Sequence, residues 1–235
     1  MNPPYPLWVN RYAAGLALAE VFSKGHGISS AHTLLLALPR GGVPVAAAMA
    51  SQLNLPLATW SVRKIADPAQ SEVAIGAIAA GGAMVWRDGE QAGQWAAKAA
   101  RHGWLQSQQE EMARRQHLFG DPAPEQLRNR HLIVVDDGIA TGMTAKAALV
   151  SLGKVDAASL SLAIPVIDSS VAQELAPLVD RLEALAYVAE LSSVGLWYQH
   201  FPQLSDSEVL EYLDSAEADN PSPAFLHHSP GLPAV

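Results

Sequence analysis

The sequence predicts an α/β protein with a mostly parallel central sheet flanked by helices, and three observations support this class. Strand-like apolar runs alternate with helical segments along the chain, which is the pattern of successive βαβ units. Residues 132–135 are apolar at every position, as expected of a strand in a parallel sheet that is covered on both faces. With 235 residues, of which 49% are hydrophobic and 16% charged, the chain is long and apolar enough to form a sizeable core.

The first quarter of the chain begins this alternation. It predicts a helix, a strand, a helix and a second strand over residues 10–22, 33–38, 43–53 and 57–62. Asn10 is placed to cap the first helix. One face of that helix is expected to carry an apolar stripe formed by Tyr12, Leu16, Ala19 and Phe22. Pro44 suits the first turn of the second helix, where a backbone N–H donor is not needed.

The middle of the chain predicts a hairpin-like excursion and then one long helix. Residues 65–71 are polar and turn-forming, and the β-prone segments 73–79 and 83–86 are separated by a turn at Gly81-Gly82. We therefore expect a hairpin with a mobile tip. Residues 90–118 are expected to form a single helix, on which Trp95, Ala99 and His102 share a face.

The last part of the chain continues the alternation. Strands are expected over residues 132–135, 157–164 and 182–188, and helices after Thr144 and over residues 168–175 and 205–213. Asp168 or Ser169 is placed to cap the second of these helices, and Ser205 with Glu208 forms a capping box for the third. From Ser215 onward, a composition rich in Pro, Ser, Asn and His favours a disordered tail. The sequence thus predicts one domain over residues 1–214 and a tail over residues 215–235.

Composition narrows the range of partners. The formal net charge is −8, with 15 basic against 23 acidic residues, which opposes wholesale binding to a nucleic-acid backbone. There is no cysteine, so disulfides, thiolate zinc sites and cysteine nucleophiles are excluded. No apolar run reaches the roughly 18 residues that span a bilayer, and the first ten residues lack the pattern of a secretory signal. We expect a cytoplasmic protein without a stable nucleic-acid or membrane partner.

Two acids and a loop of small residues follow the strand over residues 132–135. Asp136 and Asp137 lie at the carboxyl end of the strand, where open α/β sheets bind ligands. The backbone N–H groups of the loop over residues 138–144 can close on an anion, toward which the next helix directs its positive end. A phosphate pocket beside two carboxylates suits a sugar phosphate whose hydroxyls and metal ion need acidic partners. The plainer alternative, a capped strand–helix junction, accounts for only one Asp and one Thr.

This stretch, VVDDGIATGMT, resembles the phosphoribosyl pyrophosphate (PRPP) motif of the type I phosphoribosyltransferases. With PRGGVPVA and AIGA, the resemblance covers roughly residues 7–213 and is nearest to a broad group of bacterial predicted phosphoribosyltransferases whose acceptor is undefined. It implies the type I phosphoribosyltransferase fold, with a flexible excursion and a small hood built from terminal segments. It also implies that Asp136 and Asp137 bind the ribose hydroxyls, directly or through Mg²⁺. The 5′-phosphate would be bound by Gly138, Ala140, Thr141, Gly142, Met143 and Thr144.

The turn Pro39-Arg40-Gly41-Gly42 resembles the pyrophosphate-binding loop of the same family. Its two glycines let the backbone approach an anion and permit unusual geometry, such as a non-proline cis peptide bond. Arg40 would supply positive charge to the pyrophosphate. In isolation, the same residues also fit an ordinary tight turn.

Arg63 and Lys64, followed by a polar segment, resemble the flexible catalytic loop of the family. Such a loop would close over PRPP, exclude water that would otherwise hydrolyse the ribosyl centre, and place cations on the departing pyrophosphate. The alternative is a solvated basic pair at a strand end. Arg114 and Arg115 fit the basic end of a helix better than a pyrophosphate site, although contact with pyrophosphate from this or a neighbouring subunit stays open.

The acceptor is less well defined than the donor. Ala140 stands where enzymes for 6-oxopurines usually carry an acid that meets the base, and an alanine cannot exchange a proton. Glu72 is a candidate carboxylate for handling the base, although a surface glutamate needs no special role. The aromatic segment with Trp197, Tyr198 and Phe201 is either ordinary core or part of a lid that stacks a base.

The resemblance therefore implies Mg²⁺-dependent transfer of the 5-phosphoribosyl group of PRPP to a purine or pyrimidine type base, with release of pyrophosphate. Arg63, Lys64 and Glu72 would take part in catalysis, and a homodimer is compatible with this function. One alternative is a catalytically weak or inactive regulator that binds PRPP or a nucleotide with the same fold. Another reads the paired acids as a phospho-acceptor of response-regulator type, for which the TGMT loop is unnecessary.

Overall fold

The central sheet of the computed structural model is parallel throughout. The structure describes residues 6–23, 31–67, 70–87 and 92–220. Five strands follow the order β2-β1-β6-β7-β8, with β6 between β1 and β7. Their bounds are Leu57–Thr59 for β2, Thr33–Ala37 for β1, His131–Val135 for β6, Ser159–Asp168 for β7 and Arg181–Val188 for β8. The predicted α/β class and parallel sheet are confirmed.

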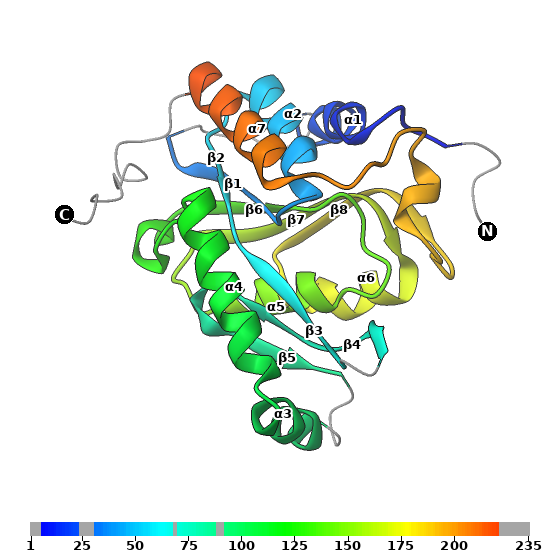
Figure 1. The fold of residues 1–235 in the computed structure, drawn as a ribbon. Helices are drawn as coiled ribbons and strands as arrows, with labels where there is room; N and C mark the ends of the chain where they lie inside the picture. Colours follow the sequence, from blue (N-terminus) through cyan, green and yellow to red (C-terminus); the bar gives the residue numbers. More distant parts are fainter. Residues whose placement is uncertain (1–5, 24–30, 68–69, 88–91, 221–235) are drawn as a thin grey trace.

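Helices cover both faces of this sheet (Figure 1). One face carries α1 (Arg11–Ser23), α2 (Gly42–Leu53) and α7 (Asp206–Asp219), and the other carries α5 (Met143–Leu152) and α6 (Ser169–Leu175). Successive side chains of a strand point to opposite faces. Thus Leu35 and Ile133 pack with α2, whereas Leu34 and Leu132 pack with α5. An apolar run without alternation was the correct sign of a strand buried on both sides.

A second, three-stranded antiparallel sheet lies beside α5 (Figure 1). Its strands are β3 (Val62–Asp67), β4 (Gln70–Ala79) and β5 (Met84–Trp86), with the short 3-10 helix η1 (Ala80–Gly82) before β5. The expected hairpin is therefore a larger sheet, and most of the segment 65–71 that was expected to be a turn belongs to its strands. Residues 68 and 69, at the expected mobile tip, lie outside the described residues.

The strand expected over residues 57–62 is divided between the two sheets. Asp121 fixes the division, because its carboxylate accepts hydrogen bonds from Thr59 Oγ1 at 2.6 Å and from the backbone N–H of Ser61 at 2.7 Å. The bond from Ser61 satisfies a backbone N–H that would otherwise donate within a strand ladder. The chain thereby leaves the parallel sheet after β2 and enters the small sheet at β3.

The long helix expected over residues 90–118 is two helices, α3 (Ala92–Arg101) and α4 (Trp104–Phe119). Gly103 separates them with a φ of +70°, a conformation that favours glycine. His102 consequently lies in the connecting turn and not on the helix face shared by Trp95 and Ala99. Residues 88–91, which include the expected start of the helix, lie outside the described part of the chain.

Helix α1 has the predicted cap, but only Ala19 and Phe22 of the predicted apolar stripe are buried. Asn10 Oδ1 accepts a hydrogen bond from the backbone N–H of Ala13 at 2.9 Å, as expected of an N-cap. Tyr12 and Leu16, however, are each 37% exposed. The buried face instead contains Ala14, Gly15, Leu18, Ala19 and Phe22. Gly15 sets this face, because a Cβ there would collide with the carbonyl oxygen of Val45 on α2.

The caps of the last two helices are as predicted, but the last helix is longer than predicted. Asp168 caps α6 by accepting from the backbone N–H groups of Ser170 and Val171, and Ser205 and Glu208 form the capping box of α7. Helix α7 continues to Asp219 and buries Ala216, so the boundary expected after residue 214 falls inside a packed helix. Residues 221–235 lie outside the described residues. Short 3-10 helices complete the fold: η2 (Pro124–Leu127), η3 (Ala176–Leu178) and η4 (Val194–Trp197).

None of the helices in the described part of the chain is both long and apolar enough to cross a membrane.

Candidate functional site

The loop between β6 and α5 brings the two predicted acids to the carboxyl edge of the central sheet. Ile139 anchors this loop, because its N–H donates to the carbonyl of Val166 and its own carbonyl accepts from the N–H of Asp168, both at 2.9 Å. Gly142 ends the loop with a φ of +70°, and a Cβ there would collide with Val171. Among the described residues, no side chain caps the first turn of α5. The backbone N–H groups of this turn can therefore bind an anion.

The turn after β1 lies against this loop. Its Pro39-Arg40 peptide bond is cis, the geometry that the sequence allowed for. A Cβ on Gly41 would collide with the carboxylate of Asp137, and a Cβ on Gly42 would collide with the carbonyl oxygen of Val135. The two glycines are therefore needed because neighbouring strands end with their loops in direct contact.

Both loops line one cavity of about 450 Å³. The predicted residues that line it are Arg40, Gly41, Lys64, Asp136, Asp137, Gly138, Ala140, Thr141, Gly142 and Thr144. Val194, Phe201 and Leu204, from the segments around η4 and before α7, add an apolar wall. Gly42 and Met143 are adjacent in sequence but do not line this cavity. Most of the predicted donor site thus converges on one space.

Burial raises the pKa of both acids in this cavity. The pKa of Asp136 is raised first by burial and then by the neighbouring Asp137 carboxylate. Burial also raises the pKa of Asp137, although the charge and hydrogen bond of Arg11 act in the opposite direction. The Asp136 carboxylate accepts a hydrogen bond from the backbone N–H of Asp137 at 2.9 Å. A cation or hydroxyl donor arriving in the cavity would therefore meet, in Asp136, a buried acid whose carboxylate accepts one backbone hydrogen bond.

Arg11 is a site residue that the sequence did not reveal. Its Nε donates to Asp137 Oδ2 at 2.7 Å, and its Nη1 donates to the carbonyl oxygen of Pro202 at 2.8 Å. Its guanidinium lies 3.6 Å from the ring centroid of Phe201. Arg11 is only 8% exposed, and its partner acid is 126 residues away along the chain. The only local signal was a single basic residue at the start of an apolar, Ala-rich helix.

The aromatic segment divides between core and cavity. Trp197 and Tyr198 are buried with Trp8, and the Tyr198 hydroxyl donates to the carbonyl oxygen of Asp137 at 2.5 Å. Burial raises the pKa of Tyr198, so this hydroxyl stays protonated as a donor. Phe201 lines the cavity beneath Arg11. Of the three aromatic residues, Phe201 is therefore the one positioned to touch a ligand.

Arg63 and Lys64 lie next to each other in β3 and consequently point to opposite faces of the small sheet. Lys64 lines the cavity, and its charge acts to lower the pKa of Asp136. Arg63 instead points toward α4, where its Nε donates to Gln108 at 2.8 Å. The structure thus separates two cations that the sequence had placed together. Glu72 belongs to β4, but its side chain lies outside the described part of the structure.

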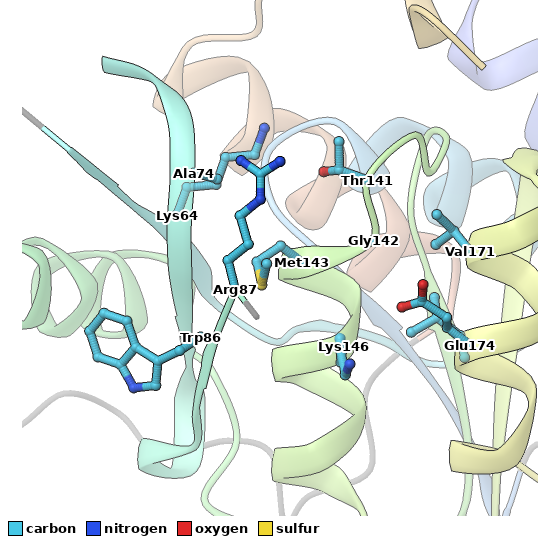
Figure 2. Close-up of a pocket in the computed structure, with 11 residues that line it drawn as sticks. Lys64, Ala74, Trp86, Arg87, Thr141, Gly142, Met143, Lys146, Val171 and Glu174 are labelled. Carbon is cyan, nitrogen blue, oxygen red and sulfur yellow. The ribbon is translucent and has the colours of Figure 1, made fainter. Parts of the chain in front are cut away.

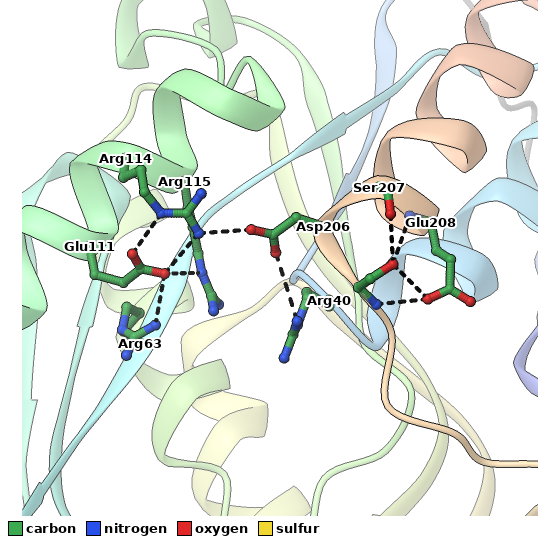
Figure 3. A network of polar contacts seen from close by, with 9 residues as sticks. Arg40, Arg63, Glu111, Arg114, Arg115, Asp206, Ser207 and Glu208 are labelled. Carbon is green, nitrogen blue, oxygen red and sulfur yellow. Dashed lines mark hydrogen bonds and ion pairs between the residues drawn. The ribbon is translucent and has the colours of Figure 1, made fainter.

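Arg63 joins a network with Arg40, Arg114, Arg115, Glu111 and Asp206 (Figure 3). Arg114 and Arg115 do not lie in the last turn of α4, which ends at Phe119 and has His117 as its basic residue. The preferred interpretation of these two arginines as a charged helix end is therefore wrong. Both arginines contact Glu111. Their hydrogen bonds and positive charges lower the pKa of the Glu111 carboxyl to about 2.

A second cavity of about 410 Å³ is lined in part by the Thr141-Gly142 backbone (Figure 2). Lys64 and Arg87 extend into it from the small sheet, whereas Lys146 and Glu174 line it from α5 and α6. The ring of Trp86 lies on the far side of its strand from the other labelled side chains. Lys64, Thr141 and Gly142 line both cavities, so the two spaces share one cation and part of the phosphate-type loop.

Known proteins are similar to this chain in sequence and in fold. The sequence model of a family described as phosphoribosyl transferase domain matches residues 13–177. Curated proteins from two strains of Mycobacterium tuberculosis, each provisionally named a phosphoribosyl transferase, are 38% identical over 216 residues. That alignment covers 91% of this chain and 48% of each relative, so the chain spans about half the length of the curated relatives it matches. The crystal structure of TT1426 from Thermus thermophilus is 28% identical with a TM-score of 0.69, covering 88% of this chain and 97% of that one.

Proposed function

Since the chain belongs to the phosphoribosyl transferase domain family, of type I, we propose that it transfers the 5-phosphoribosyl group of PRPP to a nitrogenous base. Pyrophosphate is released, and the base is of purine or pyrimidine type. The observation that carries this proposal is that three features line one cavity: the acid pair Asp136 and Asp137, the uncapped N-terminus of α5 and the Arg40 turn. These three features match the three parts of PRPP: ribose hydroxyls, 5′-phosphate and diphosphate.

The 5′-phosphate is assigned to the start of α5. Backbone N–H groups of residues 140–144 and the helix dipole attract a phosphate there. The hydroxyls of Thr141 and Thr144, both at the cavity, add donors. Asp136 and Asp137 accept hydrogen bonds from the ribose hydroxyls, and the Arg40 turn with Lys64 receives the diphosphate.

Mg²⁺ fits the acids of this cavity. Among the described residues, no group of three or more His, Asp or Glu side chains could hold a metal ion alone. Mg²⁺ often needs only one or two carboxylates, with the remaining oxygens supplied by phosphates and water. Asp136 and Asp137 would provide these carboxylates, and the ion would neutralise charge on the diphosphate. The protein's own cations, Arg40 and Lys64, lie at the same cavity.

The reaction forms a bond between a base nitrogen and C1 of the ribose while the bond from C1 to the pyrophosphate oxygen breaks. Attack from the face opposite the leaving group inverts the configuration at C1, and the proton displaced from nitrogen passes to water. Val194, Phe201 and Leu204 form an apolar wall of the cavity that limits access of water to the ribosyl centre. Ala140 offers no acid to the base, so the identity of the base depends on other residues of this wall.

A second candidate function is a regulator that binds PRPP or a nucleotide without turnover. The contact between Arg11 and Asp137 favours it, because the carboxylate needed for a ribose hydroxyl is already paired. The same contact is compatible with transfer if the other carboxylate oxygen and Asp136 receive the ribose.

Pyrophosphate release distinguishes the two functions. PRPP and Mg²⁺ are incubated with the protein and, one at a time, with a panel of purine and pyrimidine bases. The transferase proposal expects pyrophosphate release that depends on one class of base. Calorimetric binding of PRPP without release under any base would support the regulator instead. Absence of both binding and release would reject both functions.

A further inference from the structure

Four arginines from three parts of the fold lie close together (Figure 3), and one of them, Arg40, also lines the proposed donor cavity. Arg40 comes from the turn after β1, Arg63 from β3, and Arg114 and Arg115 from α4. We call them the arginine cluster. Two acids lie among them, Glu111 of α4 and Asp206 at the start of α7. The cluster therefore connects the central sheet, the small sheet and the segment that leads into α7.

The cluster contains more positive than negative charge. Glu111 contacts Arg114 at 2.7 Å, Arg115 at 3.0 Å and Arg63 at 3.4 Å, whereas Asp206 contacts Arg114 at 2.8 Å. Four arginines facing two carboxylates leave two positive charges uncompensated. Burial and the neighbouring Arg115, Arg114 and Arg40 lower the pKa of Arg63, so the four cations are close enough to repel one another. A group carrying at least two negative charges would relieve this repulsion.

The position of the cluster indicates which anion fits. Arg40 belongs both to the cluster and to the wall of the cavity in which the proposed function assigns the donor. Arg63 reaches the cluster from the face of β3 opposite to Lys64. An anion that extends from the cavity past Arg40 would approach the other arginines of the cluster, which act on one another through their charges. A diphosphate group, attached at the cavity and free at its far end, has this extended shape and sufficient charge.

Asp206 is incompletely paired within the cluster. Its Oδ2 receives Arg114, but its Oδ1 is buried and has no hydrogen-bond partner among the described residues. Arg40 Nη1 lies 3.8 Å from Oδ1, which is too long for a hydrogen bond. The two carboxylate oxygens thus face two arginines of the cluster, as two oxygens of one phosphate would, but make only one good contact.

We propose that the arginine cluster binds a diphosphate group and that Asp206 is a side-chain substitute for it, displaced when the group binds. This proposal deepens the proposed function, on which it rests for the identity of the diphosphate as that of PRPP. It adds Arg114 and Arg115 of α4 as binding residues. It also makes the contact between α4 and α7 through Arg114 and Asp206 one that opens when the diphosphate binds.

Binding measurements on the full chain test this proposal. Pyrophosphate, PRPP and ribose 5-phosphate are titrated by calorimetry into the wild type, Arg114→Gln and Arg115→Gln, with Arg128→Gln as the matched control. Arg128 is exposed and outside the cluster. Loss of a charge-assisted contact should weaken pyrophosphate and PRPP about tenfold and leave ribose 5-phosphate, which has no diphosphate, unchanged. Equal weakening of all three ligands, or of none, would overturn the proposal.

The Asp206→Asn variant tests the substitution directly, because it removes the competing charge and keeps the shape. Asp214→Asn, an exposed change on the same helix, is its control. Pyrophosphate should bind to Asp206→Asn several-fold more tightly than to the control. Unchanged or weaker binding, with a melting temperature near that of the control, would contradict the role given to Asp206.

The same titrations separate this proposal from the proposed function. If pyrophosphate binding depends on Arg114 but PRPP never yields pyrophosphate with any base, the cluster is supported and the transfer reaction is rejected. If PRPP is turned over but neither its binding nor that of pyrophosphate responds to Arg114 or Arg115, the reaction is supported and the cluster is rejected.

Discussion

Single residues explain why the two neighbouring acids have different surroundings. Asp137 is held from three sides, by Arg11 at its carboxylate, by Tyr198 at its carbonyl oxygen and by Gly41, which lies against the carboxylate. The carboxylate of Asp136 receives only the backbone N–H of Asp137 as a hydrogen-bond donor within the described structure. Asp137 therefore connects α1, the Arg40 turn and the acid loop, whereas Asp136 has more capacity to receive a ligand.

A pair of variants tests this difference at the residue scale. Arg11→Met should lower the free energy of unfolding by about 3 kcal/mol, because it leaves a buried carboxylate without its cation. Asp136→Asn should change the free energy of unfolding by less than about 1 kcal/mol, since burial already disfavours the charged form. It should nevertheless abolish most PRPP binding. Urea unfolding and calorimetry of the two variants would measure these effects, and equal losses of stability would contradict the division of roles.

Asp121 gives a prediction about pH. Burial raises its pKa to about 6, above the ordinary value of 3.8, despite the hydrogen bonds from Thr59 and Ser61. The folded protein then binds more protons than the unfolded chain between about pH 4 and pH 6. The free energy of unfolding attributable to this group therefore falls as pH rises through that window, by about 3 kcal/mol, and is constant above it.

Comparison of the wild type with Asp121→Asn isolates this contribution, because other acids titrate in both proteins. The difference in the free energy of unfolding between the two should change across pH 4–6 in the direction given. A constant difference would mean that Asp121 titrates normally.

At the scale of helices and strands, some parts of the fold were predicted from the sequence and others were not. The strand–loop–helix units around Asp136 and Arg40 were predicted well, because apolar runs, glycines and helix starts are local signals. The break at Gly103 was missed because a single glycine is tolerated in a helical pattern. The small sheet was underestimated because β3 is stabilised by contacts with α4 and α5, which local propensity does not encode.

Two glycines with the same backbone conformation provide a matched test at the element scale. Gly103 and Gly142 both have a φ of +70°, but a Cβ at Gly103 has open space whereas one at Gly142 collides with Val171. Gly103→Ala should lower the free energy of unfolding by about 1 kcal/mol from backbone strain alone. Gly142→Ala should lower the free energy of unfolding by more than this, and it should also weaken ribose 5-phosphate binding. Thermal or urea unfolding would measure the stability of both variants. Equal effects on stability would show that the contact with Val171 relaxes freely.

The whole molecule assembles the site from distant parts of the chain. Arg11, Lys64, Asp137 and Phe201 line one cavity although they belong to α1, β3, the loop after β6 and the segment after η4. The sequence identified the motifs within each local unit, but contacts such as Arg11 with Asp137 or Arg114 with Asp206 depend on how the layers pack. No spacing along the chain signals them. The fold therefore positions the predicted loops and adds arginines that no motif contained.

The proposed donor site is the cavity of about 450 Å³ between the Arg40 turn and the acid loop, and not the second cavity beside Lys146. A crystal structure with PRPP and Mg²⁺ tests this most directly. We predict the 5′-phosphate on the backbone of residues 140–144, the ribose at Asp136 and Asp137, and the diphosphate at Arg40. A donor whose ribose and diphosphate lie instead among Arg87, Lys146 and Glu174 would contradict this assignment.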